Sequence, residues 1–136
     1  MDTDLNPTPP AGPPQTPSAR SVLVIEDNID AAESLVVLLE MLGHHAEWAD
    51  LGSAGVARAA ALQPDLVLVD VGLPDIDGYE VARRLRAQAS PRPQRLVALT
   101  GYGTPEDRAR ALAAGFDDHL VKPIALPALE ALLSRA

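Results

Sequence analysis

The sequence predicts an α/β fold in which five parallel strands form one doubly wound sheet covered by five helices. Short, continuous apolar segments alternate along the chain with longer segments whose apolar residues recur at helical spacing. Continuous apolar runs are typical of strands that are buried on both faces. Right-handed crossover helices then cover the two faces of a parallel sheet, which gives the doubly wound arrangement.

Each element follows from its local sequence. The clearest strands are 21–25 and 66–69, which are almost entirely apolar, and further strands are expected at 45–48, 95–99 and 116–121. Helices are expected at 30–42, 53–62, 78–89, 106–114 and 126–133. The first helix stops at Gly43, and Pro105 and Gly115 bound the fourth, as is typical of helix ends.

The composition fits one domain with an aliphatic core, since 47% of the 136 residues are hydrophobic and only 3% are aromatic. The absence of cysteine excludes disulfides, thiolate zinc sites and cysteine nucleophiles. No apolar run is long enough to cross a bilayer, and the start of the chain lacks a signal-peptide pattern. We therefore expect a cytoplasmic protein without membrane insertion.

Residues 1–19 differ from the rest of the chain, because they contain six prolines and almost nothing that a core would bury. This composition predicts a disordered tail or linker, and residues 20–136 are expected to form the folded domain. The formal net charge is −8, from 19 acidic and 11 basic residues. Because such a protein repels phosphate backbones and its arginines cluster only modestly, we expect no direct nucleic-acid binding.

Polar side chains follow four of the predicted strands. Glu26 and Asp27 end the first strand, Asp70 the third, Thr100 the fourth and Lys122 the fifth. The carboxyl ends of parallel strands share one edge of the sheet, so we expect these five side chains to converge there. Three carboxylates placed together repel one another unless a cation lies among them, which predicts a functional site.

The types of these side chains indicate phosphoryl transfer. Oxygen ligands, without cysteine or a neighbouring histidine, favour Mg²⁺ over zinc. A carboxylate is able to attack phosphorus and form an aspartyl phosphate, and Asp70 is best placed because it ends the central strand. Lys122 and Thr100 would then neutralise the phosphoryl oxygens, which is the main requirement of this reaction.

Four segments resemble the signature segments of response-regulator receiver domains: 22–28, 66–78, 99–101 and 121–123. The resemblance covers residues 20–136 and implies a flavodoxin-like sheet with strand order 2-1-3-4-5. It implies a two-component signalling protein, not an enzyme beyond its own phosphorylation and slow dephosphorylation. The phosphoryl donor would be a histidine kinase or a histidine phosphotransfer domain. The segments 99–103 and 115–120 are most similar to receivers of hybrid histidine kinases.

The resemblance implies a role for each residue near the metal. Asp70 would accept the phosphoryl group, and Asp27 would bind Mg²⁺ directly. Glu26 stands where the family more often has aspartate, and it would act mainly through water. The carbonyl of Gly72 would complete the protein ligands.

The resemblance also implies a conformational switch. Thr100 would move toward the phosphoryl group, Lys122 would pair with that group, and the peptide bond before Pro123 would be cis. The switch position, which usually holds Tyr or Phe, is His119 here. We expect a half-buried residue that rotates with Thr100, and pH sensing is the alternative role.

Three further residues carry expectations about the surface. Tyr102, two residues after Thr100, is expected to cover the phosphoryl group partly and to slow attack by water. Val36 and Val37 lie partly off the buried stripe of the first helix. This position leaves two interpretations, wider core contact or a docking surface for the histidine-bearing donor.

Two other functions stay open. A phosphohydrolase of the haloacid dehalogenase type also uses an aspartyl nucleophile and Mg²⁺, but it needs a second aspartate where this chain has Gly72. A receiver-like module that only binds partners would not need Asp70, Thr100 and Lys122.

Because no effector sequence follows the last helix, a stand-alone regulator and the terminal receiver of a hybrid kinase are both expected arrangements.

Overall fold

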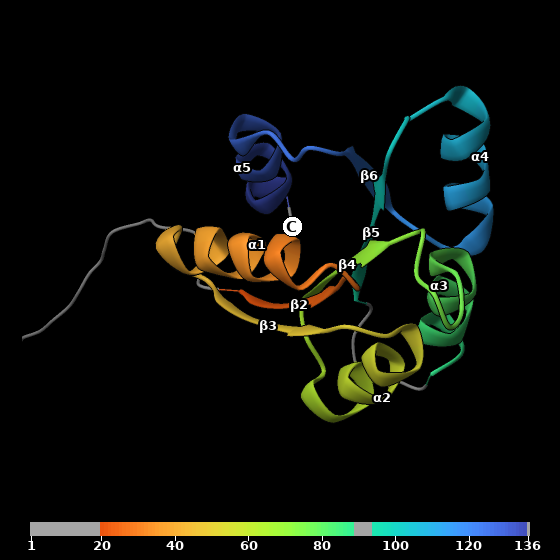
Figure 1. Ribbon diagram of the computed structural model, residues 1–136, viewed down its shortest axis with the longest axis horizontal. Coiled ribbons are helices and arrows are strands. Elements are labelled where there is room, and N and C mark those ends of the chain that lie inside the picture. Colours follow the sequence, from red (N-terminus) through yellow and green to blue (C-terminus); the bar gives the residue numbers. More distant parts are fainter. Residues whose placement is uncertain (1–19, 89–93, 136) are drawn as a thin grey trace, which may run out of the picture.

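The computed structural model describes residues 20–88 and 94–135, and the predicted tail 1–19 lies outside these ranges. The expected alternation of strands and helices is present in the described residues (Figure 1). The elements are β2 (Ser21–Ile25), α1 (Ile29–Met41), β3 (His45–Ala49), α2 (Gly52–Leu62), β4 (Leu66–Asp70), α3 (Gly78–Ala87), β5 (Arg95–Thr100), α4 (Pro105–Ala114), β6 (Asp118–Val121) and α5 (Leu126–Arg135).

The strands form one parallel sheet in the order β3-β2-β4-β5-β6. Counted along the chain this order is 2-1-3-4-5, so the predicted topology is confirmed. Strand β4 lies in the centre, between β2 and β5, and every residue from Leu66 to Asp70 is buried. Asp70 therefore lies at the carboxyl end of the central strand, as the sequence predicts.

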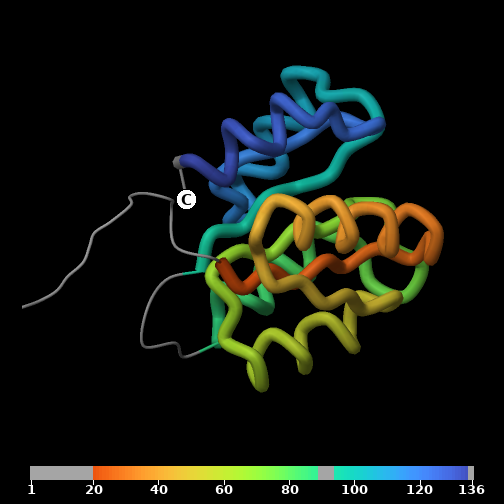
Figure 2. Tube along the Cα trace, turned by 90° about the vertical axis from the view of Figure 1, so that its left-hand side faces the viewer, coloured from red at the N-terminus to blue at the C-terminus, as the bar shows by residue number. Residues whose placement is uncertain are grey.

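Helices cover the sheet on both sides. Helices α1 and α5 pack on one face, and α2, α3 and α4 pack on the other (Figure 1). In a view turned by 90°, α2 and α5 again lie on opposite sides of the molecule (Figure 2). Side chains alternate along the central strands, so that Leu23 and Val67 belong to the cluster under α2 and α3, while Val24 and Leu68 belong to the cluster under α1 and α5. Burial of each such aliphatic side chain contributes about 1.5–3 kcal/mol.

The last strand begins later than the sequence predicts, at Asp118 instead of residue 116. Helix α4 ends at Ala114 and is capped by Gly115 with φ 113°, and the Phe116 N–H donates to the Ala111 carbonyl at 3.0 Å. This hydrogen bond uses the Phe116 N–H to close the helix, and the Phe116 side chain is buried in the core. Phe116 therefore belongs to the turn that closes α4 and not to the strand.

Arg86 of α3 fixes this end of α4. Its guanidinium donates to the carbonyl of Gly115 at 2.9 Å, to the carbonyl of Gln94 at 2.7 Å and to Asp117 Oδ2 at 2.7 Å. The same Asp117 oxygen accepts from the Leu96 N–H at 2.9 Å. One side chain thus joins α3, the start of β5 and the segment after α4.

None of the helices in the two described ranges has the length and apolar character needed to cross a membrane. The peptide bond between Lys122 and Pro123 is cis. This bond lies just after β6, at the edge of the sheet that carries Asp70.

Candidate functional site

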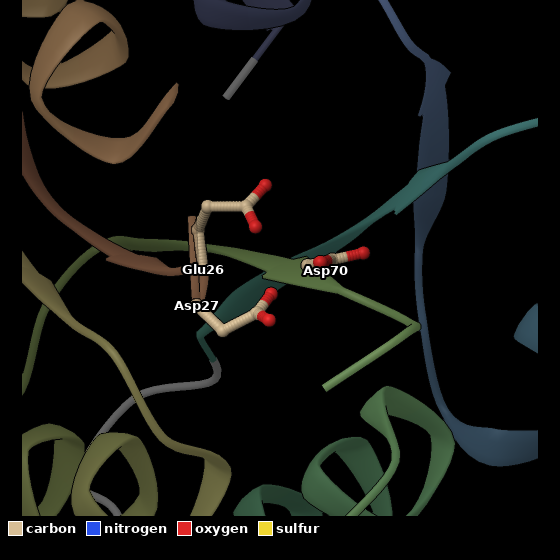
Figure 3. Close-up of side chains that lie close together, drawn as sticks. All are labelled: Glu26, Asp27 and Asp70. Atoms are coloured by element: carbon tan, nitrogen blue, oxygen red, sulfur yellow. The ribbon is translucent and has the colours of Figure 1, made fainter. Parts of the chain in front are cut away.

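Three carboxylates converge at the carboxyl end of the two central strands. Glu26 and Asp27 follow β2, whose Ile25 is paired with Val69 of β4, so they lie beside Asp70. Figure 3 shows Glu26 and Asp27 leaving the end of β2 in different directions, both toward Asp70. One oxygen from each carboxylate lies within 4.8 Å of the others. Glu26 and Asp70 are buried, whereas Asp27 is exposed.

The turn after β2 fixes the acid pair. Asn28 caps α1, because its side chain accepts the Ala31 N–H at 3.1 Å. The Asn28 N–H donates to Glu26 Oε2 at 3.1 Å, and the Glu26 N–H donates to the Ala49 carbonyl at 3.0 Å. The helix cap and the neighbouring strand together hold Glu26 in place at the end of β2.

Lys122 lies against the two buried acids. Its Nζ is 2.7 Å from Glu26 Oε1 and 3.3 Å from Asp70 Oδ1. Burial raises the pKa of Glu26 above its ordinary value, although the hydrogen bond from Lys122 opposes the rise. Burial opposes the charged form of Lys122, but its hydrogen bond to Glu26 and the charge of Asp70 outweigh this effect and raise its pKa. Lys122 therefore stays protonated at neutral pH.

Thr100 ends β5 and is only 3% exposed. Its Oγ1 has no hydrogen-bond partner among the residues that the structure describes. A buried hydroxyl in this condition costs about 1–3 kcal/mol, so such groups are rare without a function. An added oxygen acceptor near Asp70 would satisfy this hydroxyl.

The backbone of Gly72 completes the surroundings of Asp70. Its N–H donates to Asp70 Oδ1 at 3.1 Å. The possible metal ligands that the structure brings together are carboxylate oxygens, which fit Mg²⁺ and not a soft metal.

The comparisons with known proteins decide the family. The family model described as response regulator receiver domain matches residues 22–134. The chain belongs to this family of signalling domains.

Relatives of this receiver domain include parts of transcriptional regulators and of histidine kinases. The probable transcriptional regulatory protein SilR of Salmonella typhimurium is 38% identical over 108 residues, which are 79% of this chain and 46% of that protein. The chain thus spans less than half the length of the curated relatives it matches first. The receiver domain of the sensor histidine kinase PA1611 of Pseudomonas aeruginosa, described with a magnesium ion in its active site cleft, is 32% identical with a TM-score of 0.79. That match covers 87% of this chain and 97% of the other.

A third relative comes from a complex. The receiver domain of Ssk1 from Saccharomyces cerevisiae, solved with the histidine phosphotransfer protein Ypd1, is 28% identical with a TM-score of 0.79. The match covers 85% of this chain and 87% of the other chain. Receivers of kinases and of phosphotransfer pathways are thus both among the structural relatives, as the resemblance implies.

The structure brings together Glu26, Asp27, Asp70, Thr100 and Lys122 at one edge of the receiver domain, but it places Tyr102 differently. The Tyr102 side chain is 86% exposed, so its ring makes little contact with other residues. The expected partial cover of the phosphoryl group by this ring stays a prediction. The exposed loop after Thr100 leaves the ring in solvent.

The structure also separates the two valines of α1. Val36 is half-buried and packs against the core, whereas the Val37 side chain is 54% exposed. The wider-core interpretation therefore holds for Val36, and the docking interpretation stays a prediction for Val37. His119 is half-buried on β6, as expected, with Nδ1 3.9 Å from Asp118 Oδ1.

The sequence reasoning missed one contact in the site. It assigned Lys122 to the phosphoryl group and did not foresee the close ion pair with Glu26. The signal for this contact is the presence of one lysine among three acids at the same edge of the sheet, because a partly buried ammonium favours an anionic partner.

Proposed function

We propose that this receiver domain accepts a phosphoryl group on Asp70 and passes the change to Thr100 and the neighbouring surface. The observation that supports the proposal is the arrangement around Asp70. Glu26 and Asp27 lie beside it, Lys122 contacts it, and the buried Thr100 hydroxyl at the same edge lacks a partner among the described residues. These groups meet the electrostatic needs of phosphoryl transfer to a carboxylate.

The proposed nucleophile is the carboxylate of Asp70. Asp70 Oδ1 accepts from the Gly72 N–H and lies 3.3 Å from Lys122 Nζ. We assign Oδ2 as the attacking oxygen. A bond forms between Oδ2 and phosphorus, the P–N bond of the phosphohistidine breaks, and the leaving imidazole takes up a proton.

Mg²⁺ is the proposed cofactor, and when bound it supplies positive charge to the phosphoryl oxygens. Asp27 and Asp70 would hold it with carboxylate oxygens, Gly72 with its carbonyl, and Glu26 through water. Lys122 keeps its proton and neutralises the transferred group, since its pKa is raised.

Thr100 links the reaction to the conformational switch. Its hydroxyl would donate to a phosphoryl oxygen and so gain the partner that the described residues do not provide. We propose that Thr100 moves toward the phosphoryl group and thereby makes room for the side chain of His119. His119 is half-buried on the adjacent strand and paired in register with Ala98 of β5.

The proposed donor is a histidine kinase or a histidine phosphotransfer domain in the cytoplasm. The exposed side of α1 supports a docking site, because Val37 is 54% exposed and Met41 is 78% exposed on the helix that follows the acid pair. Exposed apolar side chains that are grouped in this way are typical of interaction surfaces.

The experiment is incubation of the full chain with acetyl phosphate and Mg²⁺, followed by mass spectrometry. We expect a mass gain of one phosphoryl group, located at Asp70, that is lost with EDTA and in Asp70→Asn. The matched control is Asp30→Asn, an exposed acid in the first turn of α1 that should keep the gain. Turnover of many phosphate esters would instead indicate a hydrolase, and no reaction at all would indicate a binding module. Either result would contradict the proposal.

A further inference from the structure

The loop between β4 and α3, residues 71–77, is held to the first turn of α2 by one carboxylate. Asp75 accepts from the Gly52 N–H at 2.8 Å, from the Ser53 N–H at 2.9 Å and from Ser53 Oγ at 2.7 Å. The N-cap position of α2 is Leu51, which provides no side-chain hydrogen bond. Asp75 therefore caps this helix from a different part of the chain.

Close packing reinforces this cap. A Cβ atom at Gly52 would lie 2.6 Å from Ile76 Cγ1 and 3.1 Å from the Ile76 carbonyl oxygen, so the loop and the helix are in direct contact. The N–H and hydroxyl of Ser53 hold the pKa of Asp75 far below its ordinary value. The positive end of α2 favours the same charged form.

The other end of this loop carries backbone groups of the phosphoacceptor site. The Gly72 N–H donates to Asp70 Oδ1 at 3.1 Å. The Gly78 N–H donates to the Val71 carbonyl at 3.0 Å, which closes the loop on itself. Asp77 caps α3 at the loop's end. Asp77 thus attaches the loop to α3, the helix that directly follows it in the chain. Asp75 attaches the loop to α2, which precedes β4.

We propose that Asp75 is a positioning residue for phosphorylation: by joining the β4–α3 loop to α2, it holds the Gly72 backbone in place beside Asp70. The proposal rests on the proposed function, since it concerns the Mg²⁺ and phosphoryl chemistry of Asp70. Asp75 is not one of the three carboxylates that gather at the metal site. Its charge is instead engaged by the helix end.

The test compares Asp75→Ala with the natural full chain. Removal of groups that orient metal ligands lowers affinity about 10–100-fold, and Asp75 acts one step further away, so we expect Mg²⁺ affinity to fall about 3–10-fold. Isothermal titration calorimetry measures this Mg²⁺ affinity. Phosphorylation of Asp70 by acetyl phosphate should slow. Ser53→Ala should have a smaller effect, because both backbone donors remain.

A readout without metal separates positioning from chemistry. Amide hydrogen exchange at Gly72 and Gly78, followed by NMR without Mg²⁺, should be faster in Asp75→Ala. Asp75→Asn keeps one acceptor and the side-chain shape, so it should fall between the natural chain and Asp75→Ala. It also provides the measurement if the alanine variant does not fold.

Asp65→Ala is the matched control. The Asp65 carboxylate accepts from the Ser21 N–H at 2.8 Å, at the opposite end of β4 from Asp70. Its loss should lower the melting temperature and leave Mg²⁺ affinity unchanged. If Asp75→Ala behaves like Asp65→Ala, Asp75 is only a helix cap and the inference is overturned. If the natural chain neither binds Mg²⁺ nor becomes phosphorylated, the proposed function fails as well.

Discussion

Replacement of Asp27 by asparagine tests whether the acid cluster is under electrostatic strain. The three carboxylates lie within 4.8 Å of one another, and two unit charges at that distance repel by about 1 kcal/mol in a water-like medium. The exposure of Asp27 justifies that high dielectric. Asp27→Asn removes the charge from two such pairs and preserves the shape of the side chain.

Two effects reduce the stabilisation expected from Asp27→Asn. The Lys122 ammonium, which contacts Glu26 and Asp70, also attracts Asp27 and offsets about half of the repulsion. The amino end of α1 favours a nearby negative charge by about 0.5 kcal/mol. The balance predicts that Asp27→Asn stabilises the protein by about 0.5 kcal/mol in the absence of metal, which corresponds to a rise in melting temperature of about 1–3 °C.

Differential scanning calorimetry at low ionic strength measures this effect with and without MgCl₂. In the natural chain, Mg²⁺ at 100 times its dissociation constant should add about 2.7 kcal/mol, and this increment should be lost in Asp27→Asn. Asp30→Asn is the control, because Asp30 lies in the first turn of α1 and its charge stabilises the helix. It should lower the melting temperature and keep the response to Mg²⁺. A lower melting temperature for Asp27→Asn, or a full response to Mg²⁺, would refute the reasoning.

Three other perturbations test separate features. Val37→Asp should slow phosphotransfer from a histidine-bearing donor protein at least about tenfold and leave labelling by acetyl phosphate unchanged; equal loss in both assays would count against docking. Burial lowers the pKa of His44, whose Nδ1 accepts the Arg20 N–H at 3.0 Å, so stability should be full above pH 6.5 and decline as the pH falls below it. His44→Gln should flatten this decline in thermal melts, and an unchanged slope would contradict the assignment. Gly78→Ala would place a Cβ atom 2.5 Å from Val71 Cα, so it should destabilise by about 1–3 kcal/mol in urea unfolding, whereas helix propensity alone would stabilise.

The strand ends were predictable because two simple rules agree there. Continuous apolar runs locate buried strands, and a parallel sheet brings their carboxyl ends to one edge. Asp70 and Thr100 each end a strand, and Glu26 directly follows one. Their convergence therefore followed from the order of elements without knowledge of any side-chain contact.

The contacts made by single side chains were not predictable in the same way. Val36 and Val37 are adjacent and chemically identical, and only the orientation of α1 on the sheet buries the first and exposes the second. The ring of Tyr102 follows the loop after Thr100, whose path depends on tertiary packing. The local sequence around Asp75 predicts only a loop residue, and the helix that it caps begins 23 residues earlier in the chain.

Helix α4 is attached unequally at its two ends. Arg86 fixes its carboxyl end through Gly115 and Asp117, whereas its amino end follows the largely exposed segment 101–104, directly after Thr100. The carboxyl end of α4 is therefore held more firmly than its amino end. Any displacement that starts at Thr100 would swing its first turn outward or inward and leave the surface near Gly115 almost unchanged. A protein that distinguishes the two forms of the domain would gain most discrimination by touching the beginning of α4.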